Sequence, residues 1–223
     1  MLENYFHINI YMKNALLIGT GSKWGLHLTN ELINRGYEVT VISSSNPEIN
    51  ARIFPVEYYH LTTEKIQELA SLVNDRVYDL IFFNHNSGGG PDAQYFEPNG
   101  PMINADNWSK SLYIHSMFPA IFLRMITQSI SEETKVGWML TGMIKDANPE
   151  HYQWGLYGSA KYINLCVMRL FSQNHPGIFF ALNPSWFPQG EEKQDAETIA
   201  STIEKITIQD NGICIDKNGN TWY

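Results

Sequence analysis

Apolar residues occur along this chain in two alternating patterns. Short, fully apolar runs such as Leu80–Phe83 are typical of strands that are buried on both faces of a parallel sheet. Between these runs, apolar residues return every third or fourth position, as at Trp24, Leu28 and Leu32, which is the spacing of an amphipathic helix. The chain is therefore expected to alternate between strand and helix.

The two patterns predict the elements of one α/β domain. Strands are expected at residues 15–19, 37–42, 53–59, 80–83, 136–140, 178–182 and 213–215. A first helix is expected from Trp24 to Gly36, and a second after a cap at Thr62 or Thr63, with an apolar stripe of Ile66, Leu69, Leu72 and Val73. Further helices are expected over 108–130, with a bend at Pro119, over 157–171 and over 197–206. This order predicts a single doubly wound parallel sheet of about seven strands, with helices on both faces.

The domain is expected to span residues 14–223, with residues 1–13 as an N-terminal extension. Residues 1–11 are either native or the product of an upstream start codon. They lack the features of a secretory signal, and no apolar run is long enough to span a membrane. A cytoplasmic protein without membrane contact is therefore expected.

Composition narrows the classes of partner. The net charge is -8, and no cluster of Lys and Arg is present, which argues against nucleic acid. The two cysteines, Cys166 and Cys214, lie in separate apolar stretches. This arrangement indicates neither a disulfide framework nor a metal site, and we expect both to be buried free thiols.

A glycine-rich segment connects the first expected strand to the first expected helix. It is Gly19-Thr20-Gly21-Ser22-Lys23-Trp24-Gly25-Leu26. Glycines allow a sharp turn and a close approach of the backbone, and the helix N-terminus after the turn favours an anion. The position of the turn at the first strand-to-helix junction predicts a dinucleotide-binding site, with a purely structural turn as the alternative.

A tyrosine and a lysine, Tyr157 and Lys161, lie one helical turn apart on one face of an expected helix. A nearby ammonium stabilises a phenolate and lowers the pKa of the tyrosine. Such a tyrosine can exchange a proton with a substrate oxygen while a hydride moves to or from carbon. The alternative is an ordinary amphipathic helix with a surface lysine.

With these motifs in this order, residues 14–223 resemble the short-chain dehydrogenase/reductase family, and in particular its small C-factor-like members. The glycine turn, His85-Asn86-Ser87-Gly88, the Tyr157/Lys161 pair, Asn183-Pro184-Ser185 and the tail from Gly212 to Trp222 are similar to family motifs. The resemblance implies a Rossmann fold and an NAD(P)-dependent oxidoreductase. It also implies cofactor contacts at positions in or beside these motifs and after the second and third expected strands: Gly19, Gly21, Ser22, Lys23, Gly25, Leu26, Ser43, Ser44, His60, Leu61, Asn86, Ser87, Gly88, Pro184 and Ser185.

The chain also departs from the family pattern at several positions. His27 stands where the last glycine of the turn belongs, and His60 stands where an acidic residue is expected. His115 aligns with the asparagine of a proton relay, a role that imidazole can fill. The family's catalytic serine has no clear counterpart, and Thr141 is the nearest hydroxyl. The expected catalytic set is therefore Tyr157, Lys161, Thr141, which would orient a carbonyl, and His115.

The end of the second expected strand bears on cofactor choice. Ser43, Ser44 and Ser45 occupy the place where a carboxylate would repel a 2′-phosphate, and Lys23 could neutralise one. NADP is therefore expected, with NAD as the alternative. Large apolar and aromatic residues after later strands favour an apolar or aromatic small-molecule substrate, or else contact with a partner subunit: Met143, Tyr152, Trp154, Trp186 and Phe187.

Three hypotheses about function follow. The first is an NADP-dependent carbonyl reductase or alcohol dehydrogenase, expected as a homodimer or homotetramer because family members pair through their long helices. The second is a non-catalytic nucleotide-binding protein, suggested by His27, His60 and His115 and by the missing catalytic serine. The third is an isomerase or dehydratase on the same scaffold.

Overall fold

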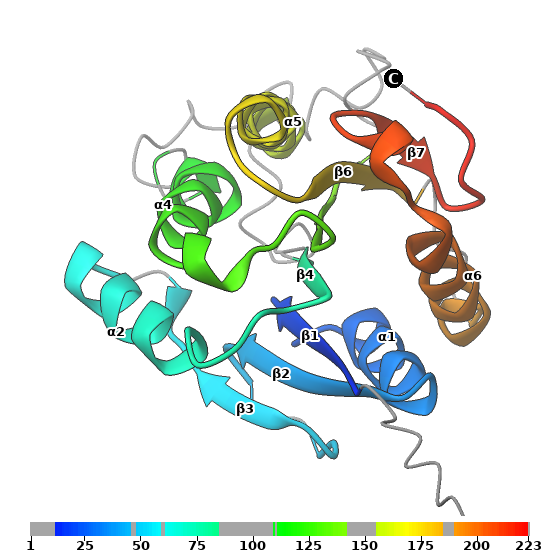
Figure 1. Ribbon diagram of the computed structural model, residues 1–223, viewed down its shortest axis with the longest axis horizontal. Helices are drawn as coiled ribbons and strands as arrows, with labels where there is room; N and C mark the ends of the chain where they lie inside the picture. Colours follow the sequence, from blue (N-terminus) through cyan, green and yellow to red (C-terminus); the bar gives the residue numbers. More distant parts are fainter. Residues whose placement is uncertain are drawn as a thin grey trace, which may run out of the picture.

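The computed structural model describes residues 12–45, 48–58, 61–84, 109, 111–141, 155–184 and 190–222. Seven parallel strands form one sheet in the order β3-β2-β1-β4-β5-β6-β7, which confirms the predicted fold class (Figure 1). The strands are β1 (Lys13–Ile18), β2 (Tyr37–Ser43), β3 (Arg52–Pro55), β4 (Leu80–Phe83), β5 (Lys135–Met139), β6 (Ile178–Asn183) and β7 (Cys214–Asp216).

Helices cover both faces of the sheet. They are α1 (Lys23–Asn34), α2 (Thr63–Val73), α4 (Phe118–Met125), α5 (Gly155–Asn174) and α6 (Glu192–Lys205). Shorter helical segments are the π-helical η3 (Tyr113–Met117) and the 3₁₀ turns η4 (Thr127–Ser129) and η7 (Ile208–Asp210). The helices α2, α4 and α5 lie on one side of the sheet, and α1 and α6 lie on the other (Figure 1).

Side chains alternate along a strand, so successive strand residues belong to the apolar cores on opposite faces of the sheet. Leu16 and Ile18 belong to the apolar core under α2, α4 and α5, whereas Ala15 and Leu17 belong to the core under α1 and α6. Every residue of β4 is buried. This burial on both faces explains why the central strands are continuously apolar.

The ends of several elements differ from the sequence prediction. The third strand ends at Pro55 and does not reach residue 59, and the last helix begins at Glu192, five residues before the predicted start at Glu197. In α2, Thr62 is the cap, accepting a hydrogen bond from the Lys65 N–H, as predicted. Leu72 is exposed rather than part of the buried stripe, and Ala70 is buried beside Leu69.

The predicted helix over 108–130 changes type along its length. A π-helical turn leads directly into α4, with helical backbone at both Met117 and Phe118, and Pro119, which has no N–H to donate, is the second residue of α4. The change in geometry lies at Tyr113–Met117, which contains His115, the residue four positions before Pro119 whose carbonyl a proline ring crowds in a regular α-helix. Single π-turns in helices are frequent at functional sites.

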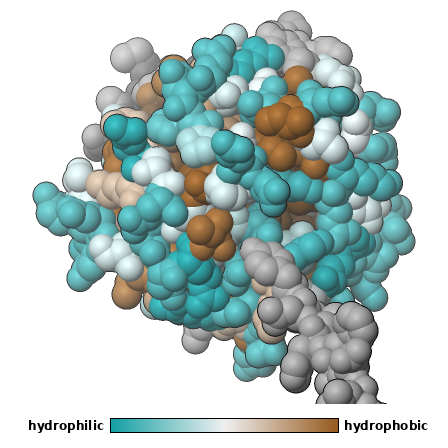
Figure 2. Space-filling view, in the orientation of Figure 1, coloured by the Kyte–Doolittle hydropathy of each residue, from teal (hydrophilic) through white to brown (hydrophobic). Residues whose placement is uncertain are grey.

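The surface differs from the sequence prediction at one of the two cysteines. Cys166 is exposed, contrary to the prediction, whereas Cys214 is buried as expected. Within the described ranges, no helix is both long and apolar enough to cross a membrane. The face shown in Figure 2 is mainly hydrophilic, with small separate hydrophobic patches.

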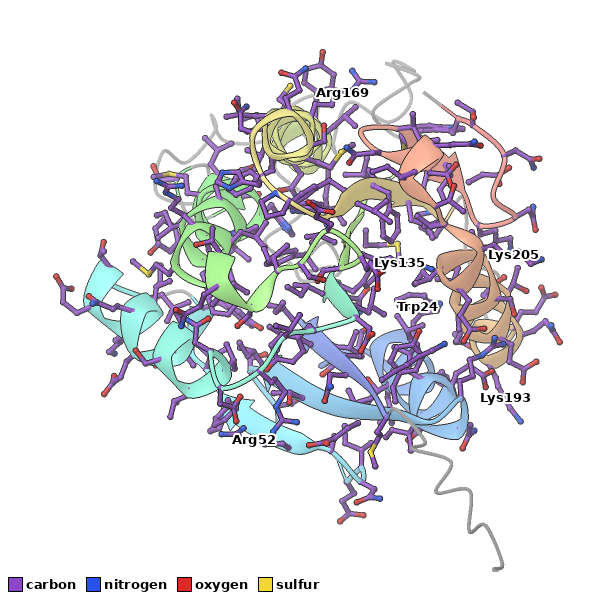
Figure 3. The ribbon with its side chains drawn as sticks, in the orientation of Figure 1. Trp24, Arg52, Lys135, Arg169, Lys193 and Lys205 are labelled. Carbon is purple, nitrogen blue, oxygen red and sulfur yellow. The ribbon has the colours of Figure 1, made fainter. Side chains whose placement is uncertain are left out.

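Polar contacts connect α6 to both the sheet and α1. Lys135, at the start of β5, donates to the carbonyl oxygens of Ile203 and Glu204 at 2.9 and 2.7 Å, which satisfies the last turn of α6 (Figure 3). Arg35, after α1, donates to Glu204 at 2.6 Å and to Ser201 at 2.8 Å. These bonds fix the position of α6 relative to α1 and to β5.

Candidate functional site

The candidate site lies where the strand order reverses. The chain proceeds outward from β1 through β2 to β3, and then returns to place β4 on the other side of β1. In open α/β sheets, ligands bind beyond the carboxyl ends of the strands at such a switch point. The glycine turn follows β1 and Asn84 follows β4, so the two segments meet there.

Backbone geometry shows why glycine is needed at two positions of the turn. Gly19 has a φ of 87°, a conformation that favours glycine, and its N–H donates to the Ile42 carbonyl at 2.9 Å. A Cβ on Gly25 would lie 2.8 Å from Asn84 Nδ2 and 2.9 Å from Thr20 Cα. Gly25 therefore permits the close packing of α1 against the turn and β4.

The turn leads into a capped helix with an accessible N-terminus. Ser22 is the N-cap, and its hydroxyl accepts from the Gly25 N–H at 3.1 Å. Leu26 and His27 are half-buried in the first turn and a half of α1. The N–H groups at the start of a helix lack helical acceptors and carry partial positive charge, so this end of α1 suits an anion.

The serines after β2 converge on Gly21. A Cβ on Gly21 would lie 3.1 Å from Ser45 Oγ, 3.6 Å from Ser43 Oγ and 3.7 Å from Ser44 Oγ. Lys23, which is predicted to neutralise a 2′-phosphate, has its ammonium 3.4 Å from a carboxylate oxygen of Glu192 at the start of α6. The pair is largely exposed on the lysine side, so it contributes little to stability.

Asn84 is a site residue that the sequence prediction missed. It is buried, its backbone N–H donates to the Ile18 carbonyl at 2.7 Å, and its Nδ2 donates to the Gly19 carbonyl at 3.1 Å. Among the described residues, its Oδ1 has no hydrogen-bond partner. Its position as a polar residue directly after a fully apolar strand was the signal available in the sequence.

The lysine of the predicted catalytic pair lies at the carboxyl end of β5. Lys161 is buried in α5, and its Nζ donates to the Met139 carbonyl at 2.9 Å. Burial lowers the pKa of Lys161 to about 7. Tyr157 lies in the first turn of the same helix, and its side chain lies outside the described residues.

The other two predicted catalytic residues lie on neighbouring segments. Thr141 is half-buried two residues beyond the end of β5, and His115 is buried at the centre of the π-helical turn η3. The hydroxyl of Ser116 donates to the Ala160 carbonyl at 2.9 Å, which fixes η3 against α5 beside Lys161. The π-turn, His115 and Lys161 therefore belong to adjoining parts of one structure.

Several predicted residues lie outside the described ranges. Among the cofactor contacts these are His60, Asn86, Ser87, Gly88 and Ser185, and among the substrate contacts they are Met143, Tyr152, Trp154, Trp186 and Phe187. Leu61 and Pro184 are described, and both are buried. No group of His, Cys, Asp or Glu within the described ranges could hold a metal ion.

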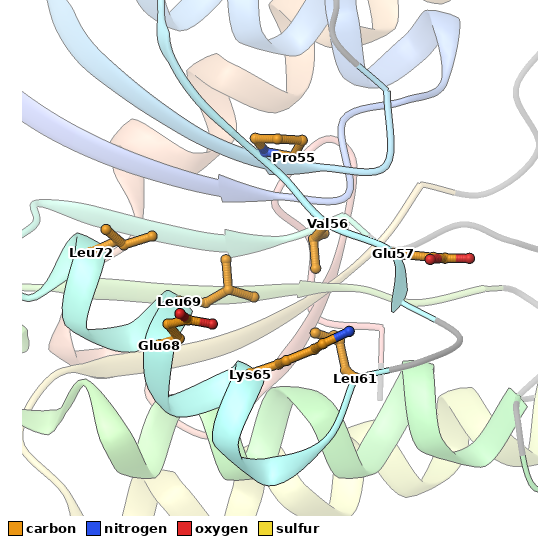
Figure 4. A pocket seen from close by; sticks show the side chains of 8 residues that line it. All are labelled: Pro55, Val56, Glu57, Leu61, Lys65, Glu68, Leu69 and Leu72. Carbon is orange, nitrogen blue, oxygen red and sulfur yellow. The ribbon is translucent and has the colours of Figure 1, made fainter.

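A cavity of about 300 Å³ lies between the end of β3 and α2 (Figure 4). Its lining includes Leu61, one of the predicted cofactor contacts, together with Val56, Leu69 and the charged side chains of Glu57 and Lys65. Apart from Leu61, its lining includes none of the predicted cofactor contacts, and it does not include the glycine turn.

Comparison with known proteins supports the fold described above. No family model and no curated protein matches the sequence. A carbonyl reductase from Pseudomonas aeruginosa PAO1 superposes with a TM-score of 0.77 at 17% identity, covering 95% of this chain and 99% of that one. The chain has the short-chain dehydrogenase fold.

Other solved structures share this fold. A carbonyl reductase from Pseudomonas aeruginosa PAO1 in complex with NADP gives a TM-score of 0.75 at 19% identity, covering 95% of this chain and 99% of that one. The short chain dehydrogenase from Shigella flexneri gives 0.72 at 13% identity, covering 92% of this chain and 90% of that one. The similarity thus extends over nearly the whole of each chain.

Proposed function

We propose that this chain is an NADP-dependent oxidoreductase of short-chain dehydrogenase/reductase type. It reduces a carbonyl group of an apolar or aromatic small molecule, or oxidises the corresponding alcohol. The observation that carries the proposal is the burial of Lys161 against the carboxyl end of β5, one helical turn after Tyr157. The glycine turn lies at the same edge of the sheet, after β1, so both motifs open onto one side of the fold.

The residues of the turn fit a dinucleotide. Gly19 gives the turn its left-handed backbone, Gly25 lets α1 pack closely, and Gly21 leaves exposed space in front of the serines. Asn84 holds the Gly19 carbonyl and has a buried Oδ1 still able to accept a hydrogen bond. A cofactor bound here would supply a hydride as NADPH during reduction or accept one as NADP⁺ during oxidation.

The chain's own residues handle the proton. Tyr157 gives a proton to the substrate oxygen during reduction and takes one during oxidation. Lys161, when protonated, favours the phenolate form of Tyr157 and so lowers the pKa of the tyrosine. Thr141 orients the carbonyl through its hydroxyl, and His115 relays protons from the π-turn.

One observation favours a second candidate, a nucleotide-binding protein without catalytic activity. The Nζ of Lys161 is already bonded to the Met139 carbonyl, and burial lowers its pKa to about 7. A lysine that is partly neutral at physiological pH stabilises a phenolate less. This candidate binds NADP and turns over no carbonyl compound.

The exposed side of α5 supports a homodimer. Large apolar side chains are exposed there at Tyr162, Ile163 and Leu170, and Met117 of the adjoining π-turn is also exposed. Exposed apolar patches of this kind mark interaction surfaces. We propose that two copies pair through this face.

Turnover by the wild type and two matched tyrosine variants tests the enzymatic proposal. NADPH oxidation is followed with a panel of aromatic and aliphatic aldehydes and ketones. Tyr157→Phe should keep cofactor affinity and lose roughly 10²–10⁴-fold in turnover, as expected for the loss of a general acid. Tyr162→Phe, five residues along the same helix and exposed, is the control and should remain active.

Equal turnover by wild type and Tyr157→Phe would exclude Tyr157 as the proton donor. Binding of NADPH without turnover of any carbonyl compound would favour the non-catalytic candidate.

A further inference from the structure

The π-turn η3 lies between the segment before α2 and the helix α5, and it is hydrogen-bonded to both. Its first residue, Tyr113, donates its hydroxyl to the Leu61 carbonyl at 2.6 Å. Its fourth residue, Ser116, donates its hydroxyl to the Ala160 carbonyl of α5 at 2.9 Å. Lys161 is the next residue of α5. The turn therefore connects the segment before α2 to the part of α5 that contains the proposed catalytic pair.

The bond of Ser116 joins two helical segments, which is not what most helical hydroxyls of this chain do. A helical serine or threonine can bond to the carbonyl four residues back in its own helix. Thr29, Ser71 and Thr198 do so at 2.8–2.9 Å. Ser116 instead reaches Ala160, whose small side chain permits a close approach, and both residues are buried. Ser116 therefore fixes the position of η3 relative to α5.

Tyr113 attaches the turn to the rest of the fold. The Phe118 N–H donates to the Tyr113 carbonyl five residues back, which is the wide spacing of a π-turn. Tyr113 is half-buried, and burial raises its pKa, so its hydroxyl keeps the proton that it donates to Leu61. A break in this bond would leave η3 free to move together with whatever it holds.

The turn of α5 over residues 157–161, which we call the reactive turn, depends on two neighbouring elements. The helix α5 packs against η3, β5 and β6. Lys161 Nζ donates to the Met139 carbonyl of β5, and Ser116 of η3 holds the carbonyl one residue earlier. Proton transfer requires donor and acceptor within hydrogen-bond reach, and a misplacement of about 1 Å can cost about 100-fold in rate. A small displacement of the reactive turn should therefore lower turnover.

We propose that η3 positions the reactive turn for proton transfer, with Ser116 holding that turn and Tyr113 holding η3. Both are positioning residues, because they act through α5 rather than on the substrate. The inference rests on the proposed function, which assigns proton transfer to Tyr157 and its activation to Lys161.

Kinetics and hydrogen exchange of Ser116→Ala test the first bond. With NADPH and the carbonyl compound that the wild type reduces fastest, the variant should lose at least about tenfold in kcat and keep the Kd of NADPH, because the glycine turn is untouched. Amide exchange in the α5 peptide that contains Lys161 should become faster. Ser129→Ala, which removes a buried 2.8 Å serine bond to Asn74 beyond the other end of α4, is the matched control and should change neither.

Tyr113→Phe tests the second bond and its link to the first. The variant loses one hydroxyl and should lose several-fold in kcat. The double variant with Ser116→Ala should be within about twofold of Ser116→Ala alone, because the two bonds support the reactive turn in series. Tyr78→Phe, which loses a 3.0 Å bond from a buried tyrosine to the Val73 carbonyl, is the matched control and should keep the wild-type kcat.

The outcomes separate this inference from the proposed function. Unchanged kcat in Ser116→Ala, or an equal loss in Ser129→Ala, would overturn the positioning role and leave the proposed function standing. A lower kcat with unchanged exchange in α5, or two effects that multiply in the double variant, would overturn it as well. If the wild type reduces no carbonyl compound, the proposed function fails and this inference fails with it.

Discussion

Replacing Lys161 with methionine measures the free energy of burying a cation at the carboxyl end of β5. Burial lowers the pKa of Lys161 from 10.5 to about 7. At about 1.4 kcal/mol for each tenfold change in ionisation, the buried ammonium costs folding about 5 kcal/mol. Methionine has a similar length and no charge, so the variant avoids this cost. It loses the hydrogen bond to the Met139 carbonyl, which contributes about 1 kcal/mol.

The sign of the pH dependence follows from the lowered pKa. Below about pH 7 both the folded and the unfolded protein are protonated at this site, so the cost is present in full. Between about pH 7 and 10.5 the folded protein has released the proton and the unfolded chain has not, so the stability of the wild type rises with pH. We therefore expect Lys161→Met to be more stable than the wild type by about 4 kcal/mol near pH 6 and by about 1 kcal/mol near pH 9.

Urea unfolding followed by tryptophan fluorescence at both pH values provides the measurement. Lys193→Met is the matched control, because Lys193 is exposed on α6 (Figure 3) and its removal should leave the pH dependence unchanged. A Lys161→Met variant that is less stable than the wild type at both pH values would refute the reasoning. Such a result would mean that the ammonium is well compensated in the folded protein.

Three further measurements test the packing of the glycine turn, the role of Asn84 and the proposed dimer. Gly25→Ala should lower the free energy of unfolding, measured by urea titration, by about 1–3 kcal/mol, because its Cβ would contact Asn84 and the Thr20 backbone at 3 Å or less. An unchanged free energy of unfolding would show that the turn can move to accommodate the methyl group. Asn84→Ala should weaken NADPH binding in calorimetry, because it releases the Gly19 carbonyl, and unchanged affinity would limit Asn84 to a packing role. Exposed Cys166 should react with maleimide more slowly as protein concentration rises if α5 pairs two copies, and a concentration-independent rate would contradict that interface.

The fold could be predicted from the sequence where burial on both faces leaves a clear pattern. The apolar run at β4 predicted its bounds correctly, because every side chain there is covered. The edge strand β3 was predicted too long, since Tyr58 is apolar and buried yet lies beyond Pro55, after the chain has left the sheet. The start of α6 is polar, and Asp195 is buried there through a 2.6 Å contact with Lys217, which local periodicity cannot show.

The sequence motifs of the site could be predicted, whereas contacts between residues distant in the sequence could be predicted less well. The glycine turn and its capping serine depend on local backbone requirements, so they are visible in the sequence. The role of Asn84 depends on β4 lying beside β1, and the π-turn carries no sequence pattern of its own. The burial of Lys161 likewise arises from packing of α5 against β5 and η3, which only the assembled fold reveals.

Calorimetric titration of NADPH into the wild type and Gly21→Val tests the central claim most directly. Gly21 is exposed, and a side chain there would fill the space in front of the serine hydroxyls without displacing the core. The account predicts that the wild type binds NADPH with one site per chain, and that Gly21→Val is folded, with an unchanged unfolding transition, and no longer binds it. Wild-type affinity in the folded variant would contradict the assignment of the glycine turn as the cofactor site.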